Sequence, residues 1–254
     1  MLFRRKLFDT KNVLTKKVPT DHNVISLQDK AHEILGVKRD DEIDGLPSYY
    51  YEVHNHHELF HLGKMYFEDM QAGVKCFAIG SLGYKTSQQR AILGLTSFFD
   101  LQKNLKVGIV SDNLYRGVFK NVVQHCQLVP EFIPGSNLKI DIHQFAGHFD
   151  FIDMNDILLL SDEEPKSFYS ILDKFIATHD LVFFDVPDLG RIKRKFYHYR
   201  PLLSYFESLS IIVVKKMSDS TYLNEIIDFY EGHGINLKGV VIDSKSGAGS
   251  ELHE

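Results

Sequence analysis

The chain has 254 residues, of which 44% are hydrophobic and 25% charged, with a formal net charge of −5. This is the composition of a globular protein with one large or two small domains, and its acidic balance argues against a nucleic-acid-binding surface. Two cysteines fit a reducing cytoplasm, and no apolar run approaches the roughly 18–20 residues of a membrane span.

Residues 1–50 carry mixed charge, two prolines and little periodicity, which predicts a partly flexible N-terminal arm. Within it, the apolar residues of Leu27–Leu35 share one helical face and predict a short helix. Met1–Phe8 (MLFRRKLF) is basic and apolar, but no long apolar region follows, so it is not a secretory signal. A short anchor on anionic lipid and an ordinary chain terminus both remain open.

From residue 74 onward, predicted strands and helices alternate. We expect strands near Val74–Gly80, Lys106–Ser111, Ile157–Ser161, Leu181–Asp185, Leu209–Lys215 and Gly239–Asp243. We expect helices near His57–Met70, Thr86–Lys103, Tyr115–His125, Lys166–His179, Arg191–Phe206 and Ser220–His233. Several strands are continuous apolar runs, which is typical of strands buried on both faces. The alternation predicts an α/β domain with right-handed βαβ units and a mainly parallel central sheet flanked by helices.

The domain is expected to span residues 51–244, after the arm and before a flexible tail at 245–254 (KSGAGSELHE). The segment 129–151, with prolines and glycines between apolar patches, has no readable pattern.

The α/β pattern is organised around residues 74–100, where an apolar strand leads through a glycine-containing turn into Lys85-Thr86-Ser87 and a helix. A phosphate-binding loop needs this order. Its backbone N–H groups and the helix N-terminus face an anion, a lysine reaches the outer phosphates, and a hydroxyl holds magnesium.

The usual pattern G-x-x-x-x-G-K-[ST] is nevertheless incomplete. With Lys85 on the lysine position, Ile79 and Tyr84 stand where the two glycines belong, while Gly80 and Gly83 lie one position away. A tyrosine before the lysine crowds a site where glycine allows close backbone approach. Whether the loop still binds phosphate therefore decides the function.

Polar residues at the ends of two other strands support a nucleotide site. Asp185 ends an apolar strand, in the position of the carboxylate that holds magnesium's water or orients an attacking water. Asp112 and Asn113 follow the strand that ends at Ser111. The alternative is that polar residues merely end strands, as they do in any doubly wound domain.

At this point the chain, from about His57 to Ser244, resembles the MinD/ParA-type (SIMIBI) P-loop ATPases, and among them the bacterial tyrosine kinases (BY-kinases) of capsule and exopolysaccharide export. Their deviant Walker A loop resembles CFAIGSLGYKTSQQRAILGLTSFFD, their second motif resembles VSDNLYRG, their Walker B resembles DLVFFDVPD and their closing strand resembles GVVID. The resemblance implies a three-layer P-loop NTPase-like fold.

The resemblance also implies functional residues, if the site works. Lys85 and Asp185 would be catalytic, and Thr86 and Asp185 would bind magnesium. The nucleotide-binding residues would be Gly80, Gly83, Lys85, Thr86, Ser87, Asp112, Asn113 and Asp243. ATP and magnesium would be the cofactors of a functional loop.

The chain departs from the family at most of its chemical positions. The signature lysine of the deviant loop falls on Gly80, two aspartates of the second motif fall on Ser111 and Asn113, and the adenine-contacting asparagine falls on Asp243. The assembly motif E-x-x-R-x-x-R falls on Glu58, His61 and Lys64, and no tyrosine follows Tyr230. Lost magnesium ligands and a crowded phosphate site predict loss of phosphotransfer, with no nucleotide cofactor.

We therefore expect a pseudo-ATPase or pseudokinase in the cytoplasm or peripheral at the inner membrane. It would regulate or scaffold a membrane-associated machine, such as polysaccharide export, through a protein partner, with a homo-oligomer as a further expectation and no nucleic acid. The alternative is an active ATPase or protein tyrosine kinase with a divergent loop.

Two other motifs compete with this interpretation. His57-Glu58-Leu-Phe-His61 matches the zincin pattern H-E-x-x-H, so a zinc-dependent hydrolase is a second alternative, although a third ligand is needed and a polar helix face explains the same residues. Arg191–Arg200 is a basic patch that would contact phosphates, an acidic partner or lipid, or simply form a solvated helix face.

Overall fold

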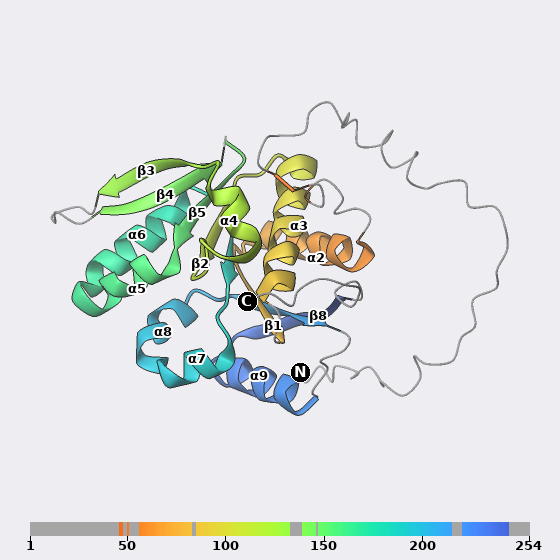
Figure 1. Ribbon diagram of the computed structural model, residues 1–254. Helices are drawn as coiled ribbons and strands as arrows, with labels where there is room; N and C mark the ends of the chain where they lie inside the picture. The colour runs from red at the N-terminus through yellow and green to blue at the C-terminus, as the bar shows by residue number, and fades with distance from the viewer. Residues whose placement is uncertain are drawn as a thin grey trace, which may run out of the picture. The chain divides into compact units, whose positions relative to one another are not determined.

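The computed structural model describes residues 46–47, 50, 56–82, 85–132, 139–145, 147–214 and 220–243 (Figure 1). They belong to one compact unit, Asp41–Glu254. The predicted helix at Leu27–Leu35, the N-terminal eight residues and the tail at 245–254 lie outside the described residues.

An eight-stranded sheet runs through this unit in the order β3-β4-β5-β2-β6-β1-β7-β8. Its strands are β1 (Cys76–Leu82), β2 (Val107–Ser111), β3 (Gln127–Phe132), β4 (Lys139–Phe145), β5 (Phe149–Asp153), β6 (Leu181–Asp185), β7 (Ser208–Val214) and β8 (Asn236–Asp243). Neighbours from β5 to β8 pair in parallel, and β3 and β4 extend the sheet by antiparallel pairing. The predicted mainly parallel sheet is confirmed.

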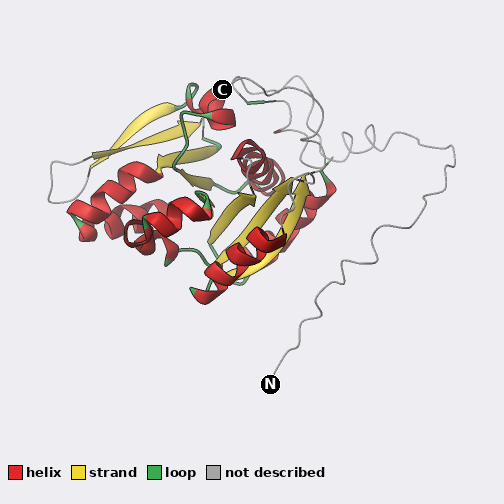
Figure 2. Ribbon diagram, turned by 60° about the horizontal axis from the view of Figure 1, so that its bottom comes forward, coloured by secondary structure: helices red, strands yellow, loops and turns green. Residues whose placement is uncertain are grey.

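Helices cover both faces of the sheet (Figures 1 and 2). The described helices are α2 (His57–Gln71), α3 (Lys85–Lys103), α4 (Gly117–Val123), α5 (Met154–Glu163), α6 (Pro165–Ala177), α7 (Leu189–Arg194), α8 (Phe196–Leu203) and α9 (Ser220–Gly232). The apolar core has two parts, one against α2, α3 and α4, the other against α5 to α9. Because successive strand residues point to opposite faces, Phe183 joins the first part and Phe184 the second. Both faces are buried, which explains the continuous apolar runs.

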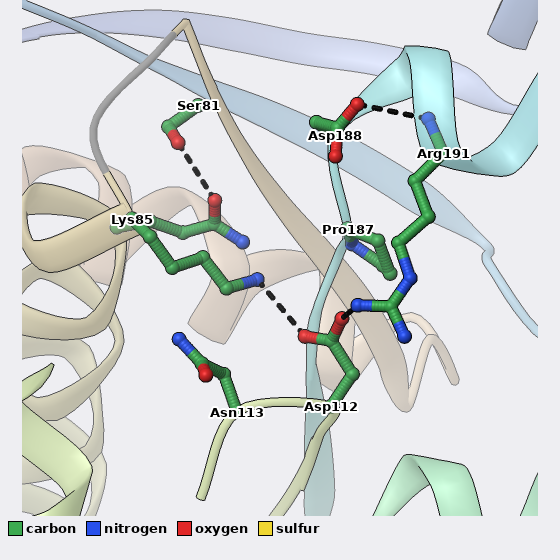
Figure 3. Close-up of a pocket in the computed structure, with 8 residues that line it drawn as sticks. Ser81, Lys85, Asp112, Asn113, Pro187, Asp188 and Arg191 are labelled. Atoms are coloured by element: carbon green, nitrogen blue, oxygen red, sulfur yellow. Dashed lines mark hydrogen bonds and ion pairs between the residues drawn. The ribbon is translucent and has the colours of Figure 1, made fainter. Parts of the chain in front are cut away.

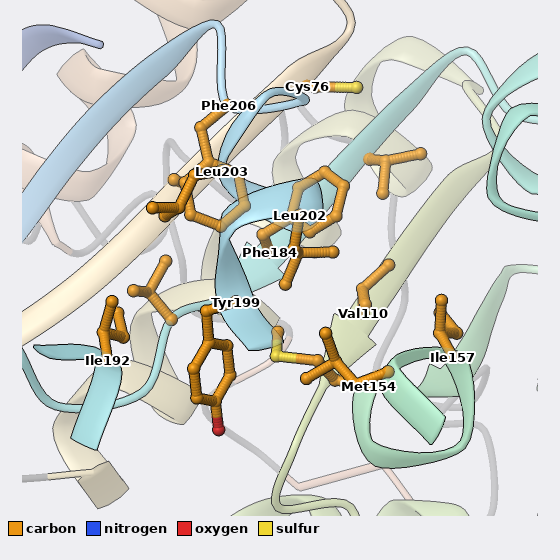
Figure 4. Close-up of a cluster of buried hydrophobic side chains, with 14 of the residues drawn as sticks. Cys76, Val110, Met154, Ile157, Phe184, Ile192, Tyr199, Leu202, Leu203 and Phe206 are labelled. Carbon is orange, nitrogen blue, oxygen red and sulfur yellow. The ribbon is translucent and has the colours of Figure 1, made fainter. Parts of the chain in front are cut away.

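The second part of the core includes residues from β1, β2, β6 and the helices α5, α7 and α8 (Figure 4). Cys76 lies in it with 4% of its surface exposed.

The strand predicted at Ile157–Ser161 is wrong, because these residues belong to helix α5. The preceding strand is β5, and Asp153 caps the helix by accepting a hydrogen bond from the Asn155 backbone N–H at 2.7 Å. A short apolar run fits a buried strand and a buried helix equally well. Here Leu159 is 57% exposed while its neighbours in the run are buried, which shows the helical face.

Two further predictions change in the structure. The segment 129–151, which had no readable pattern, contains most of β3, all of β4 and the start of β5. The single helix predicted at Arg191–Phe206 is two helices, α7 and α8, which are separated by Lys195.

Candidate functional site

The parallel register brings the carboxyl ends of β1, β2 and β6 together. Asp185 in β6 pairs with Ile79 of β1 on one side and with Ser111 of β2 on the other. Beyond these strand ends lies a cavity of about 310 Å³ (Figure 3). It is lined by Ser81, Lys85, Gln88, Asp112, Asn113, Pro187, Asp188 and Arg191.

Lys85 is the first residue of helix α3, and its side chain points toward Asp112 (Figure 3). It also contacts the carboxylate of Asp185. Its Nζ lies 3.0 Å from Asp185 Oδ1 and 3.4 Å from Asp112 Oδ1. It also donates to the backbone oxygen of Val186 at 3.0 Å. The lysine is therefore held by protein acceptors.

Asp185 is fully buried, and both of its oxygens have protein partners. Oδ1 accepts from Gln88 Nε2 at 2.7 Å in addition to its contact with Lys85, and Oδ2 accepts from Ser111 Oγ at 2.6 Å. Burial raises the pKa of Asp185, and the Lys85 charge and the Ser111 hydrogen bond only partly offset it. A water on a bound magnesium ion would have to compete with these donors.

Gln88 joins the strand ends from inside α3. Its Nε2 lies 2.6 Å from the Ile79 backbone oxygen and 2.9 Å from that of Val186, and its Oε1 accepts from Ser81 Oγ at 2.8 Å. A single buried amide thus adds a donor to a carbonyl of β1 and to the carbonyl that follows β6, which also accept from the Val186 backbone N–H and from Lys85 Nζ, respectively.

The opposite wall of the cavity is a second ion pair. Arg191 Nη1 donates to Asp112 Oδ2 at 2.5 Å, and its Nη2 lies 3.3 Å from Asn155 Oδ1. Asn155 donates in turn to the Asp112 backbone oxygen at 3.1 Å. Asp112 is therefore shared between Lys85 and Arg191, and both cations that line the cavity are engaged by carboxylates.

The structure brings together four of the nine predicted site residues. Lys85, Asp112 and Asn113 line the cavity, and Asp185 lies buried next to Lys85. The other predicted positions lie elsewhere: Ser87 is buried in α3, Thr86 is half-buried and outside the cavity lining, Gly80 is inside β1, Gly83 is outside the described residues, and Asp243 ends the edge strand β8.

Sequence reasoning missed Ser81, Gln88, Pro187 and Asp188, and it assigned Arg191 to a surface patch. The only signal for Gln88 was an amide close to the start of a mostly apolar helix. The same is true of the neighbouring Gln89, whose Oε1 accepts from the Val118 backbone N–H, so this signal could not single out one glutamine.

The sheet also occupies half of the expected phosphate loop. Residues 79–82, the first four of the eight pattern positions, lie in β1 and pair with Ser210–Val213 of β7. Only residues 83 and 84 separate β1 from α3. The backbone N–H groups of this stretch that face β7 serve the sheet and are not available to surround a phosphate.

The H-E-x-x-H residues lie on α2. His57, Glu58 and His61 are all exposed, and the imidazole centroids are 6.5 Å apart. Among the described residues, no group of three or more His, Cys, Asp or Glu side chains is placed to hold a metal ion. The described part of the chain thus supplies no third ligand for a zinc site.

In the part of the chain that the structure describes, no helix has both the length and the apolarity that a membrane span requires.

No family model matches the chain, and no curated protein matches it in sequence. Solved structures are similar to it, and two tyrosine kinase domains are among them. The kinase domain of Escherichia coli tyrosine kinase ETK has a TM-score of 0.55 at 16% identity, covering 75% of this chain and 76% of that one. The BceF tyrosine kinase domain has a TM-score of 0.51 at 15% identity, covering 72% and 75%. The chain therefore has the α/β, P-loop NTPase-like fold of bacterial tyrosine kinase domains.

Proposed function

We propose that this chain is a catalytically degenerate relative of the BY-kinases and MinD/ParA-type ATPases. It acts through protein contacts as a regulator or scaffold of a membrane-associated machine, with polysaccharide export as the process that the resemblance favours. Its place is the cytoplasmic side of the inner membrane, and its own self-association is part of the proposal.

The observation that carries this proposal is the short connection between β1 and α3. A phosphate-binding loop binds its anion through backbone N–H groups that no strand uses. Here half of the pattern is part of the sheet, and two residues remain for the turn.

The charges of the site support the same conclusion. Lys85 and Arg191 are both engaged by carboxylates, and both oxygens of Asp185 already accept hydrogen bonds. A nucleotide triphosphate would need free cations and a magnesium ion would need free carboxylate oxygens. Lys85, Arg191 and Asp185 therefore do not fit a nucleotide and magnesium without rearrangement, and Asp112 Oδ1 is the one buried carboxylate oxygen of the described site that accepts no hydrogen bond.

The alternative function, an ATPase or tyrosine kinase with a divergent loop, rests on one observation. Lys85 and Asp185 stand at family positions and lie next to each other at the correct edge of the sheet. In that case Lys85 would contact phosphates, Thr86 would ligate magnesium and Asp185 would orient a water on the metal.

Calorimetric titration with a non-hydrolysable ATP analogue, with and without magnesium, separates the two functions. We expect no saturable binding below about 1 mM in the wild type. The matched variants are Lys85→Met and Lys193→Met, whose lysine pairs with Glu225 on the surface. Micromolar, magnesium-dependent binding that Lys85→Met loses and Lys193→Met retains would overturn the proposal and establish the alternative.

A further inference from the structure

We propose that the corner between α7 and α8 binds the surface of an anionic membrane. We call Arg194, Lys195, Tyr197 and Arg200 the basic corner. They lie where α7 ends and α8 begins, and all four side chains are exposed.

The local charge stands out on an acidic protein. Residues 191–200 (RIKRKFYHYR) contain five lysines and arginines and no acidic residue, whereas the whole chain has a net charge of −5. Two of the five are engaged, Arg191 by Asp112 and Lys193 by Glu225. Arg194, Lys195 and Arg200 have no ion-pair partner within the described ranges, so three positive charges are available to a ligand.

The packing of the two helices fixes the direction of this surface. Ile192 of α7 and Tyr199 and Leu202 of α8 are buried in the core (Figure 4). Because residues three or four positions apart share a helix face, the basic corner lies on the opposite, solvent-facing side. Its presentation is therefore set by the core and does not require any rearrangement.

An exposed aromatic ring in the basic corner favours a membrane over a soluble polyanion as its ligand. Tyr197 is 86% exposed, the most exposed large hydrophobic side chain among the described residues, and Arg200 lies one turn further along the same helix. Tyrosine rings lie at the headgroup level of bilayers, where a ring beside lysine and arginine side chains is favourable. A soluble acidic peptide would use the cations and leave the ring without a role.

This inference deepens the membrane-associated role proposed above and rests on it, but it does not depend on the state of the cavity. Nucleotide titration reports on the site around Lys85, whereas vesicle binding reports on the basic corner. The two can fail separately.

The test is co-sedimentation of the full chain with vesicles. We expect partition onto phosphatidylcholine vesicles that contain about one-third phosphatidylglycerol, no partition onto pure phosphatidylcholine, and weaker binding as salt rises. Each lysine or arginine near such a surface contributes about five-fold, so R194Q/K195Q/R200Q should lower the partition coefficient about 100-fold. Tyr197→Ser should lower it several-fold, and this part of the loss should persist at high salt.

A matched control removes equal charge elsewhere. K64Q/K120Q/K166Q changes exposed lysines of α2, α4 and α6 and should leave more than about half of the binding. Failure of the wild type to bind anionic vesicles would overturn the inference. Binding by R194Q/K195Q/R200Q equal to that of the wild type would also overturn it. If R4Q/R5Q/K6Q loses binding and R194Q/K195Q/R200Q does not, the membrane contact belongs to the N-terminal segment instead.

Discussion

Replacing Lys85 with methionine tests whether this lysine is a structural counter-ion. It faces the carboxylates of Asp185 and Asp112. The Asp185 side chain is fully buried, and the Asp112 side chain is 4% exposed. Removing one partner of a buried ion pair typically costs 3–5 kcal/mol, because an uncompensated charge remains. Water reaches the Lys85 side chain, which is 28% exposed, and Arg191 still compensates Asp112. We therefore expect a loss near the lower limit, about 3 kcal/mol.

The loss should depend on pH. In the wild type, burial raises the pKa of Asp185 and the Lys85 charge partly offsets this increase. Without that charge, the pKa of Asp185 in Lys85→Met should lie still further above its usual value. A folded-state pKa above the unfolded value means that the folded state binds the proton more tightly, so protonation stabilises the fold. The deficit of Lys85→Met should shrink as the pH falls through that raised pKa, and Lys85→Met/Asp185→Asn should recover most of the stability at pH 7.

Urea denaturation followed by circular dichroism, from neutral to mildly acidic pH, measures these differences. A loss of about 3 kcal/mol corresponds to a Tm lowered by roughly 6–12 °C for a domain of this size. Lys193→Met, which removes an exposed pair with Glu225, should cost at most about 1 kcal/mol. A loss no greater than that of Lys193→Met, or a loss that does not change with pH, would refute the assignment of Lys85 as a counter-ion.

Two other predictions concern the rest of the domain. Burial would raise the pKa of Asp150, but hydrogen bonds and charges from His179 and Lys106 hold it below its usual value. This carboxylate therefore stabilises the fold above about pH 4 and ceases to do so as the pH falls through its lowered folded pKa. Wild type and Asp150→Asn should thus differ in urea midpoint at pH 7 and converge as the pH falls below that pKa. A Cβ at Gly108 would lie 2.7 Å from a phenylalanine ring carbon of α6, so Gly108→Ala should cost about 1–3 kcal/mol. In Gly239→Ala, where a Cβ meets nothing within 4 Å, the Tm should change far less; equal changes would contradict the packing argument.

Much of the fold was predictable because burial on both faces leaves a clear trace in sequence. The runs around Phe183 and Ile211 are long, apolar and bounded by polar residues, and both are strands of the parallel sheet. The carboxyl-end rule then brings Asp185 and Ser111 to one edge, and the structure pairs them directly. Helix α5 was mistaken for a strand because four apolar residues in a row carry no period.

The site was predictable only where it follows the family's motifs. Lys85, Asp112 and Asp185 come from positions with a chemical role, so the sequence identifies them. Gln88 and Arg191 lie near the starts of α3 and α7, and their importance depends on which carbonyl or carboxylate the tertiary structure places opposite them. Neither spacing nor composition contains that information.

The polar network explains how a nucleotide fold can persist without nucleotide chemistry. At the edge where the parallel strands end, the Val186 carbonyl and the Asp185 carboxylate need partners, and such groups destabilise a fold when they are buried alone. In this chain Gln88 and Lys85 supply those partners from α3. A phosphate that recruited Lys85 would first have to remove it from Asp185, at a cost close to that of deleting it. About 3 kcal/mol weakens an affinity more than 100-fold, so the interactions that now stabilise the sheet edge also oppose nucleotide binding.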